Sequence, residues 1–213
     1  MVAAGFLRLV THARVFVEPT PLEAAQEFLA ALRPYIWRRH LDFAAIHDIH
    51  SIKRQIDAHR GGGQVKVLGH NVKLGRGGIR EIEFFVQTQQ LIAGGRNPKL
   101  RGSRTTDMLA ALAEAEWITP AAAAELALAY RFLRRVEHRL QMVNDEQTHT
   151  LPGPGEAFER LARFCGHMRS ATFADALRRT FETVQGHYAA LFEGAAELGN
   201  DVPDAPAIAS LVQ

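Results

Sequence analysis

Apolar residues recur every three to four positions through most of this chain, which is the spacing of an amphipathic helix. Thr119 followed by Pro120 is typical of a helix start, because threonine can cap the first N–H groups and proline fits the first turn. Pro34 is expected to kink or restart the helix that contains it. The predicted fold class is therefore all-α, mainly a helical bundle. The pattern predicts helices over residues 22–32, 43–59, 79–93, 106–115, 120–143, 156–164 and 172–192.

Residues 65–74 depart from the helical spacing and alternate between apolar and polar side chains. This alternation predicts one short strand, or a hairpin that turns at residues 69–71. Two short strands do not form a stable sheet alone. We therefore expect them to pack on the helices or to pair with a segment outside this chain.

Changes in the pattern divide the chain into three parts. Residues 21–194 form the predicted helical domain, and residues 1–20 precede it as a linker. Residues 195–213 contain two prolines and few large side chains, so we expect a flexible tail.

The composition excludes several classes of protein. Hydrophobic residues make up 47% of the 213 residues, which is enough for a core and excludes disorder over most of the chain. No apolar run approaches the length of a membrane span, and the first residues lack the pattern of a signal peptide. Cys165 is the only cysteine, so it cannot form a disulfide framework, and we interpret it as a small core residue. These features predict a cytoplasmic protein without membrane contact.

Positive charge gathers in one part of a nearly balanced chain. The formal net charge is +2, too small for a typical nucleic-acid-binding protein, and aromatic residues do not interleave with the basic loop as a stacking surface would need. Residues 70–104, however, contain seven lysines and arginines against two glutamates. This stretch is suited to a phosphate-bearing or acidic partner, or it is an ordinary solvated loop. Its basic residues are Lys73, Arg76, Arg80, Arg96, Lys99, Arg101 and Arg104.

A glycine-rich turn lies inside this basic stretch, just before the helix predicted over residues 79–93. Gly75, Gly77 and Gly78 surround Arg76, and Lys73 precedes them. A strand, a glycine turn and a helix start together present free N–H groups and a positive dipole end, which suit a phosphate. A turn built for close packing explains the same glycines, and the spacing matches neither a P-loop nor a dinucleotide fingerprint.

Two predicted helices carry the same polar pattern, Arg-x-x-Glu-x-x-x-Gln. These spacings place all three side chains on one helix face. The stripes are either a polar seam that touches a ligand or a neighbouring domain, or a buried network that fixes the register of the helices. Their members are Arg80, Glu83 and Gln87 in one helix and Arg134, Glu137 and Gln141 in the other.

Catalytic and metal-binding constellations are not predicted. Glu81 and Glu83 lie two positions apart and so face different sides of a helix. His47 and His50 share a helix face but have no third ligand nearby. We therefore assign no catalytic residue and no metal site to this chain.

Two long motifs carry a resemblance to a known family. They are VKLGRGGIREIEFFVQTQQLIAGGRNPKLR, which begins at Val72, and RFLRRVEHRLQMVNDEQTHTLP, which begins at Arg131. Together with ALRPYIWRRHLDFAAI and FERLARFCG, they resemble the bifunctional glutamine synthetase adenylyltransferase/adenylyl-removing enzymes. The resemblance covers residues 10–192.

The resemblance implies a place for this chain within a larger enzyme. Members of the family have two halves, each a nucleotidyltransferase domain followed by a helical domain, and the motifs here resemble the N-terminal half, which removes AMP from glutamine synthetase. The helical part is similar to the domain that follows the catalytic domain of PII uridylyltransferases. Glutamine synthetase and the PII protein are the implied partners, and Mg²⁺ with ATP or ADP are the implied cofactors of the full-length enzyme. The implied supporting residues, which contact nucleotide or a domain interface, are Lys73, Gly75, Arg76, Gly77, Gly78, Arg80 and Glu83.

One departure from the family pattern bears on catalysis. The nucleotidyltransferase domains of this family hold Mg²⁺ with an Asp-x-Asp pair, and this sequence contains no Asp-x-Asp. Residues 1–20 are therefore interpreted as the remnant of a missing nucleotidyltransferase domain, and we expect no catalysis or strong cofactor binding from this chain alone. The alternative is a stand-alone helical module that binds PII or another protein and has no catalytic role.

Overall fold

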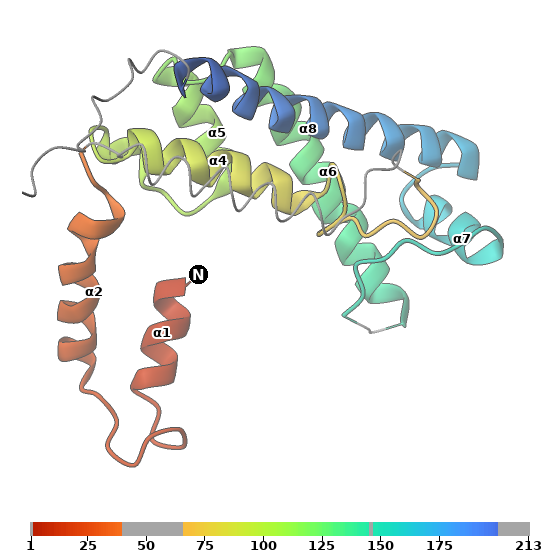
Figure 1. The fold of residues 1–213 in the computed structure, drawn as a ribbon. Helices are drawn as coiled ribbons and strands as arrows, with labels where there is room; N and C mark the ends of the chain where they lie inside the picture. The colour runs from red at the N-terminus through yellow and green to blue at the C-terminus, as the bar shows by residue number, and fades with distance from the viewer. Residues whose placement is uncertain (1, 40–65, 145–146, 200–213) are drawn as a thin grey trace, which may run out of the picture. The chain divides into compact units, whose positions relative to one another are not determined.

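The computed structural model describes residues 2–39, 66–144 and 147–199. Within these ranges the chain is all-α, with seven α-helices, one short 3-10 helix and no strand (Figure 1). None of the described helices is long and apolar enough to cross a membrane. The elements are α1 (Val2–Val10), α2 (Leu22–Ile36), α4 (Ile79–Ala93), η1 (Pro98–Leu100), α5 (Thr105–Glu114), α6 (Pro120–Asn144), α7 (Glu156–Phe164) and α8 (Ser170–Gly199).

The helices belong to two compact units, and two of them run through both. The first unit comprises Met1–His59 and Val86–Tyr130, and the second comprises Arg60–Phe85 and Arg131–Gln213. Helix α4 begins in the second unit and ends in the first, whereas α6 does the reverse.

The second unit is built on one apolar face of α8. Phe173, Leu177 and Phe181 recur at four-residue intervals on this face and are fully buried. Helix α7 packs on the same face, where the ring centroids of Phe158 and Phe173 lie 5.4 Å apart. This face supports the residues discussed below, because the turn before α4 lies against Phe181.

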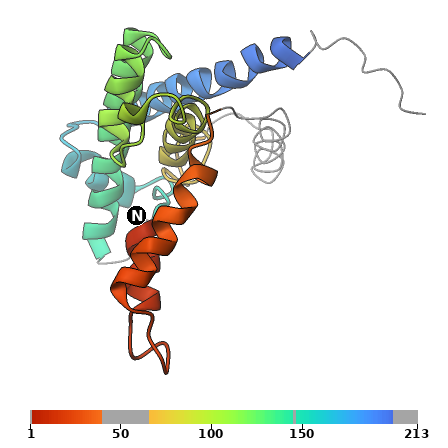
Figure 2. The same cartoon turned by 90° about the vertical axis from the view of Figure 1, so that its left-hand side faces the viewer.

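In the first unit, α1 and α2 lie side by side (Figures 1 and 2). Phe6 stacks on Phe28 at 5.7 Å between ring centroids, and Ala25 is the buried residue of α2. Further along the chain, Gln90 of α4 donates hydrogen bonds from Nε2 to the carbonyl oxygens of Leu100 (2.6 Å) and Gly102 (2.9 Å). The loop after α4 is thereby fixed to its helix.

Most of the helices predicted from the sequence are confirmed within one or two residues. Helices α4 and α7 have the predicted bounds, and Thr119 caps α6 by accepting a hydrogen bond at Oγ1 from the N–H of Ala122 at 3.1 Å. Three differences stand out. Helix α1 was not predicted, α2 continues two residues beyond Pro34, and α8 extends past the predicted bounds at both ends. Pro34 stands in the last turn of α2, two residues before its end. Its missing N–H therefore removes one backbone hydrogen bond without interrupting a long stretch of helix.

The predicted hairpin is wrong for the described residues 66–74, which form turns and a single bridge. Asn71 bridges to Thr150, the N–H of Val72 donates to the carbonyl of His149 at 2.8 Å, and the N–H of Leu151 donates to the carbonyl of His70 at 2.8 Å. The backbone partner of this segment is therefore the loop after α6 and lies within the chain. A pairing between residues so far apart in sequence leaves no local signal.

Some predictions fall outside the described residues. The helix expected over residues 43–59, with His47 and His50, is one of them, and so is the tail from residue 200 onward.

Candidate functional site

The glycine-rich turn is held by side chains on both of its sides. The Asn71 Oδ1 atom accepts hydrogen bonds from the N–H groups of Lys73 (3.0 Å) and Leu74 (2.7 Å). His70 Nε2 lies 2.9 Å from the carbonyl oxygen of Arg76, and its ring packs on Phe181 with centroids 4.4 Å apart. The turn is therefore a fixed structure, set by asparagine and histidine, before α4 begins.

The N–H groups at the start of α4 already have acceptors inside the chain. Gly77 donates to Oε2 of the buried Glu81 at 2.8 Å, which also places a carboxylate near the helix start. The N–H groups of Gly77, Gly78, Ile79 and Arg80 are therefore not free for a phosphate, which contradicts that part of the prediction, and the side chains of the turn are the groups left to make such a contact. Three further N–H groups donate to backbone carbonyl oxygens at 3.0 Å: that of Gly78 to Gly75, that of Ile79 to Val72, and that of Arg80 to Lys73.

The glycines of the turn are explained by close packing. Gly77 has φ of +70°, and a Cβ at this position would overlap with the backbone of Phe181 in α8. A Cβ at Gly75 would overlap with the carbonyl oxygen of Asn71, and one at Gly78 would lie 2.8 Å from the carbonyl oxygens of Val72 and Gly75.

Glu137 of α6 is the centre of a polar cluster that joins three segments. Its side chain is only 2% exposed. Lys73 Nζ lies 3.4 Å and His149 Nδ1 3.0 Å from Oε1, and Arg134 Nη1 donates to Oε2 at 2.6 Å. The turn before α4 and the loop after α6 (yellow and turquoise in Figure 1) are thus both tied to α6 through this carboxylate.

The six residues of the two polar stripes have different surroundings. In α6, Arg134 and Glu137 form the cluster, and Gln141 Nε2 lies 3.4 Å from His149 Nδ1. In α4, Arg80 pairs with Glu83 at 3.1 Å near the surface. Gln87 is exposed and belongs to the first unit. Glu137 at the centre of the α6 stripe is buried, whereas Arg134 is 36% exposed, so both interpretations of this stripe stay predictions.

Sequence reasoning missed two histidines that organise this region. His70 supports the turn, and His149 completes the cluster around Glu137. Both stand in short loops, where no periodic pattern marks which side chains turn inward. The only signal in the sequence was their position in or beside the two long motifs.

The carboxylates of this region do not fit a divalent cation. No group of three or more His, Cys, Asp or Glu gathers among the residues that the structure describes. Glu81 accepts a backbone N–H, and Glu137 is matched by lysine and arginine. Both carboxylates are therefore engaged by donors of the chain, whereas Mg²⁺ is held by carboxylate oxygens that are free to coordinate it.

Comparison with known proteins identifies the family. A family model described as GlnD PII-uridylyltransferase matches residues 50–192, which include the turn, α4 and the Glu137 cluster. The chain belongs to this family. Its similar curated relatives include proteins named bifunctional glutamine synthetase adenylyltransferase/adenylyl-removing enzyme. These matches confirm the resemblance that the two sequence motifs indicated.

Three such relatives show the extent of the match. The protein of Mesorhizobium japonicum is 62% identical over 177 residues, which are 83% of this chain and 18% of the relative. The protein of Brucella melitensis is 59% identical, over 83% of this chain and 18% of the relative. That of Bradyrhizobium diazoefficiens is 61% identical, over 80% of this chain and 17% of the relative. The chain thus spans less than a fifth of the length of these relatives.

Proposed function

We propose that this chain is the helical domain of the deadenylylating half of a glutamine synthetase adenylyltransferase/adenylyl-removing enzyme. The observation that carries the proposal is the 62% identity over 83% of the chain with a relative of that name. The relative is much longer, and this sequence contains no Asp-x-Asp pair for a nucleotidyltransferase centre. The chain therefore supports and couples catalytic domains, without a reacting group of its own.

The Glu137 cluster supports this role. It joins α6, the turn before α4 and the loop after α6 through one carboxylate, as expected of a domain that positions another. Its carboxylate is buried, whereas the side chains of Lys73 and Arg134 are 32% and 36% exposed. These two cations, together with Arg76, are the groups that we place at the nucleotide or at the interface with the catalytic domain.

The reaction of the whole enzyme then belongs to the adjoining domain. An oxygen of inorganic phosphate attacks the phosphorus of the adenylyl group on the glutamine synthetase tyrosine. The bond from phosphorus to the tyrosine oxygen breaks, ADP forms, and the tyrosine oxygen takes a proton. Mg²⁺ and ATP or ADP are bound by that domain, and glutamine synthetase and PII are the protein partners of the assembly.

A chimera tests the proposal. This chain replaces its matching 177 residues in the Mesorhizobium relative, and phosphate-dependent release of ADP from adenylylated glutamine synthetase is measured. We expect the chimera to retain the activity and the chain alone to have none. Lys73→Ala and Arg76→Ala in the chimera are expected to lower the activity, and Lys66→Ala, at an exposed lysine, is the matched control.

Three results would contradict the proposal. They are release of ADP by the chain alone, an inactive chimera that is folded by circular dichroism, and full activity of the Lys73 and Arg76 variants. Calorimetric titration of the chain with ATP, ADP, AMP and Mg²⁺, and then with PII, distinguishes the proposed function from the alternative of a stand-alone binding module. Tight PII binding by the chain together with an inactive chimera would indicate a stand-alone interaction module.

A further inference from the structure

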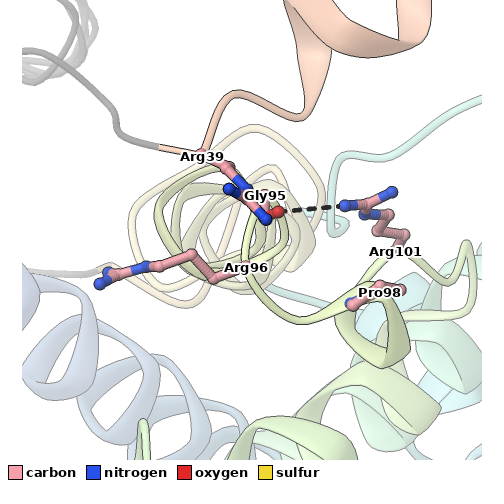
Figure 3. A pocket seen from close by; sticks show the side chains of 5 residues that line it. All are labelled: Arg39, Gly95, Arg96, Pro98 and Arg101. Carbon is pink, nitrogen blue, oxygen red and sulfur yellow. Dashed lines mark hydrogen bonds between the residues drawn. The ribbon is translucent and has the colours of Figure 1, made fainter.

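An open depression of about 540 Å³ lies at the end of α4 in the first unit. Three of the five residues that line it are arginines, and none is acidic (Figure 3). The turn-and-cluster region described above does not include it. Its lining residues are Arg39, Gly95, Arg96, Pro98 and Arg101.

Gly95 is what allows the depression to form. A Cβ at this position would overlap with the carbonyl group of Arg38, so only glycine lets the segment after α2 pass directly over the end of α4. This approach brings Arg39 beside a loop that begins at residue 94. Gln90 holds the same loop in place through its bonds to Leu100 and Gly102.

Arg101 is fixed at one side of the depression. Its Nε donates to the carbonyl oxygen of Gly94 at 2.6 Å. Its Nη2 donates to the carbonyl oxygen of Gly95 at 3.2 Å, the bond drawn in Figure 3. Its guanidinium also lies over the Trp37 ring, 5.6 Å from the centroid. Arg101 therefore neutralises the carbonyl end of α4, which would otherwise repel an anion, and its Nη1 has no acceptor among the described residues.

Arg39 and Arg96 supply charge that no described carboxylate neutralises. Both side chains are exposed, and neither has an ion-pair partner among the residues that the structure describes. In Figure 3, Arg39 lies over Gly95, and Arg96 extends away on the side opposite Arg101. Exposed side chains rotate within nanoseconds, so Arg96 can turn towards a ligand at little cost.

We propose that this depression binds the phosphate group of a small molecule. Guanidinium groups match phosphate oxygens with paired hydrogen bonds, and the volume suits a small ligand rather than a polymer. Trp37, the aromatic residue nearby among those that the structure describes, is covered by Arg101, so its ring is not free to stack a nucleic-acid base. Inorganic phosphate and a nucleotide phosphate share the same chemistry here.

Titration calorimetry of the full chain tests the site. Inorganic phosphate and ADP are titrated in separate experiments at constant ionic strength, with chloride as the background anion. We expect saturable binding of phosphate, and stronger binding of ADP would identify a nucleotide as the source of the group. Arg39→Ala and Arg96→Ala are each expected to weaken binding about tenfold, as loss of one charge-assisted contact does.

Arg160→Ala is the matched control, because this arginine is exposed on α7 in the second unit, and it should leave binding unchanged. Arg101→Lys keeps the charge but loses the paired geometry, so it should also weaken binding. Absence of saturable binding, or binding that persists in the Arg39→Ala/Arg96→Ala double variant, would overturn the proposal. So would binding of an acidic peptide without binding of phosphate. These results do not depend on the chimera assay, so this site and the proposed function can fail separately.

Discussion

The Glu137 carboxylate is a buried charged group of the second unit that contacts three side chains. A buried carboxylate is costly unless donors surround it. Here Arg134 and Lys73 supply charge and His149 supplies a ring nitrogen. Because the carboxylate joins three segments, the loss of its side chain removes several tertiary contacts at once.

We predict that Glu137→Ala lowers the free energy of unfolding by about 3 kcal/mol, since it leaves cationic partners without their buried counter-charge. Urea unfolding followed by circular dichroism measures the change. Asp175→Ala is the control, because Asp175 pairs with Arg178 at the surface with the same three-residue spacing, and its loss should cost about 0.5 kcal/mol or less. Equal effects of the two substitutions would rule out a special role for the cluster.

Cys165 ends α7 as a partly buried thiol. Burial raises the pKa of this thiol above its ordinary value of 9.0, and the nearby Arg139 guanidinium offsets part of the rise. The thiolate is the nucleophilic form of cysteine. The raised pKa favours the unreactive thiol form, but the side chain is half-buried and lies outside the buried core, so the interpretation of Cys165 as a core residue holds only in part.

Cys165 gives a pH-dependent prediction. The folded chain holds the thiol proton more tightly than the unfolded chain does. Its contribution to stability is therefore fully present below the unfolded pKa and is lost as the pH rises through the folded pKa. Iodoacetamide should react slowly at about pH 8 in the folded chain and rapidly in urea. Arg139→Ala should slow the folded reaction further, and Arg160→Ala should not; faster alkylation of Arg139→Ala would contradict the prediction.

At the scale of elements, the contact between the glycine turn and α8 decides how α4 starts. Gly77 combines a left-handed φ with direct contact to the backbone of Phe181. Gly69 has a similar φ of +74°, but a Cβ added there would have no atom within 4 Å. A substitution at Gly69 therefore causes backbone strain alone, whereas one at Gly77 causes strain and a steric overlap.

We predict that Gly77→Ala destabilises the chain by at least about 3 kcal/mol, because α8 or the turn must move. Gly69→Ala should cost about 1 kcal/mol, the strain of a left-handed alanine. Thermal unfolding of both variants measures the difference. Similar losses of stability in the two variants would show that the positive φ alone, and not the contact with α8, explains why residue 77 is a glycine.

At the scale of the whole molecule, the first unit exposes several large apolar side chains on α1 and α2. The exposed fractions are 53% for Leu9, 52% for Leu22, 53% for Phe28 and 47% for Ile36. Exposed apolar groups of this kind are typical of surfaces that contact another protein or domain. They are consistent with a chain that matches only part of much longer relatives.

We predict that Leu22→Gln/Ile36→Gln lowers the binding of a hydrophobic dye by the chain and shifts Tm by no more than about 2 °C, since exposed positions add little to stability. Ala25→Gln is the contrasting variant, because Ala25 is 1% exposed, and it should lower Tm clearly. A large fall in Tm for the double variant would show that these side chains are part of the core.

Helices followed from the sequence because their signals are local. Apolar spacing placed α4 and α7, and Thr119 with Pro120 marked the start of α6. Helix ends set by distant packing were missed, and so was α1. The hairpin was wrong because the alternating residues near Val72 find their backbone partners in the loop around His149, far along the chain.

The sequence by itself determined the all-α class and the family, since helical periodicity and long specific motifs are properties of neighbouring residues. It also identified Lys73, Arg134 and Glu137 as candidates, without showing which of them meet. Only the tertiary structure decided that these three join His149, that the N–H groups of Gly77 and Gly78 are already bonded, and that Arg39 reaches Gly95. Each of these contacts joins residues from separate segments or depends on packing against them, and burial and close packing, which local spacing does not encode, bring them together.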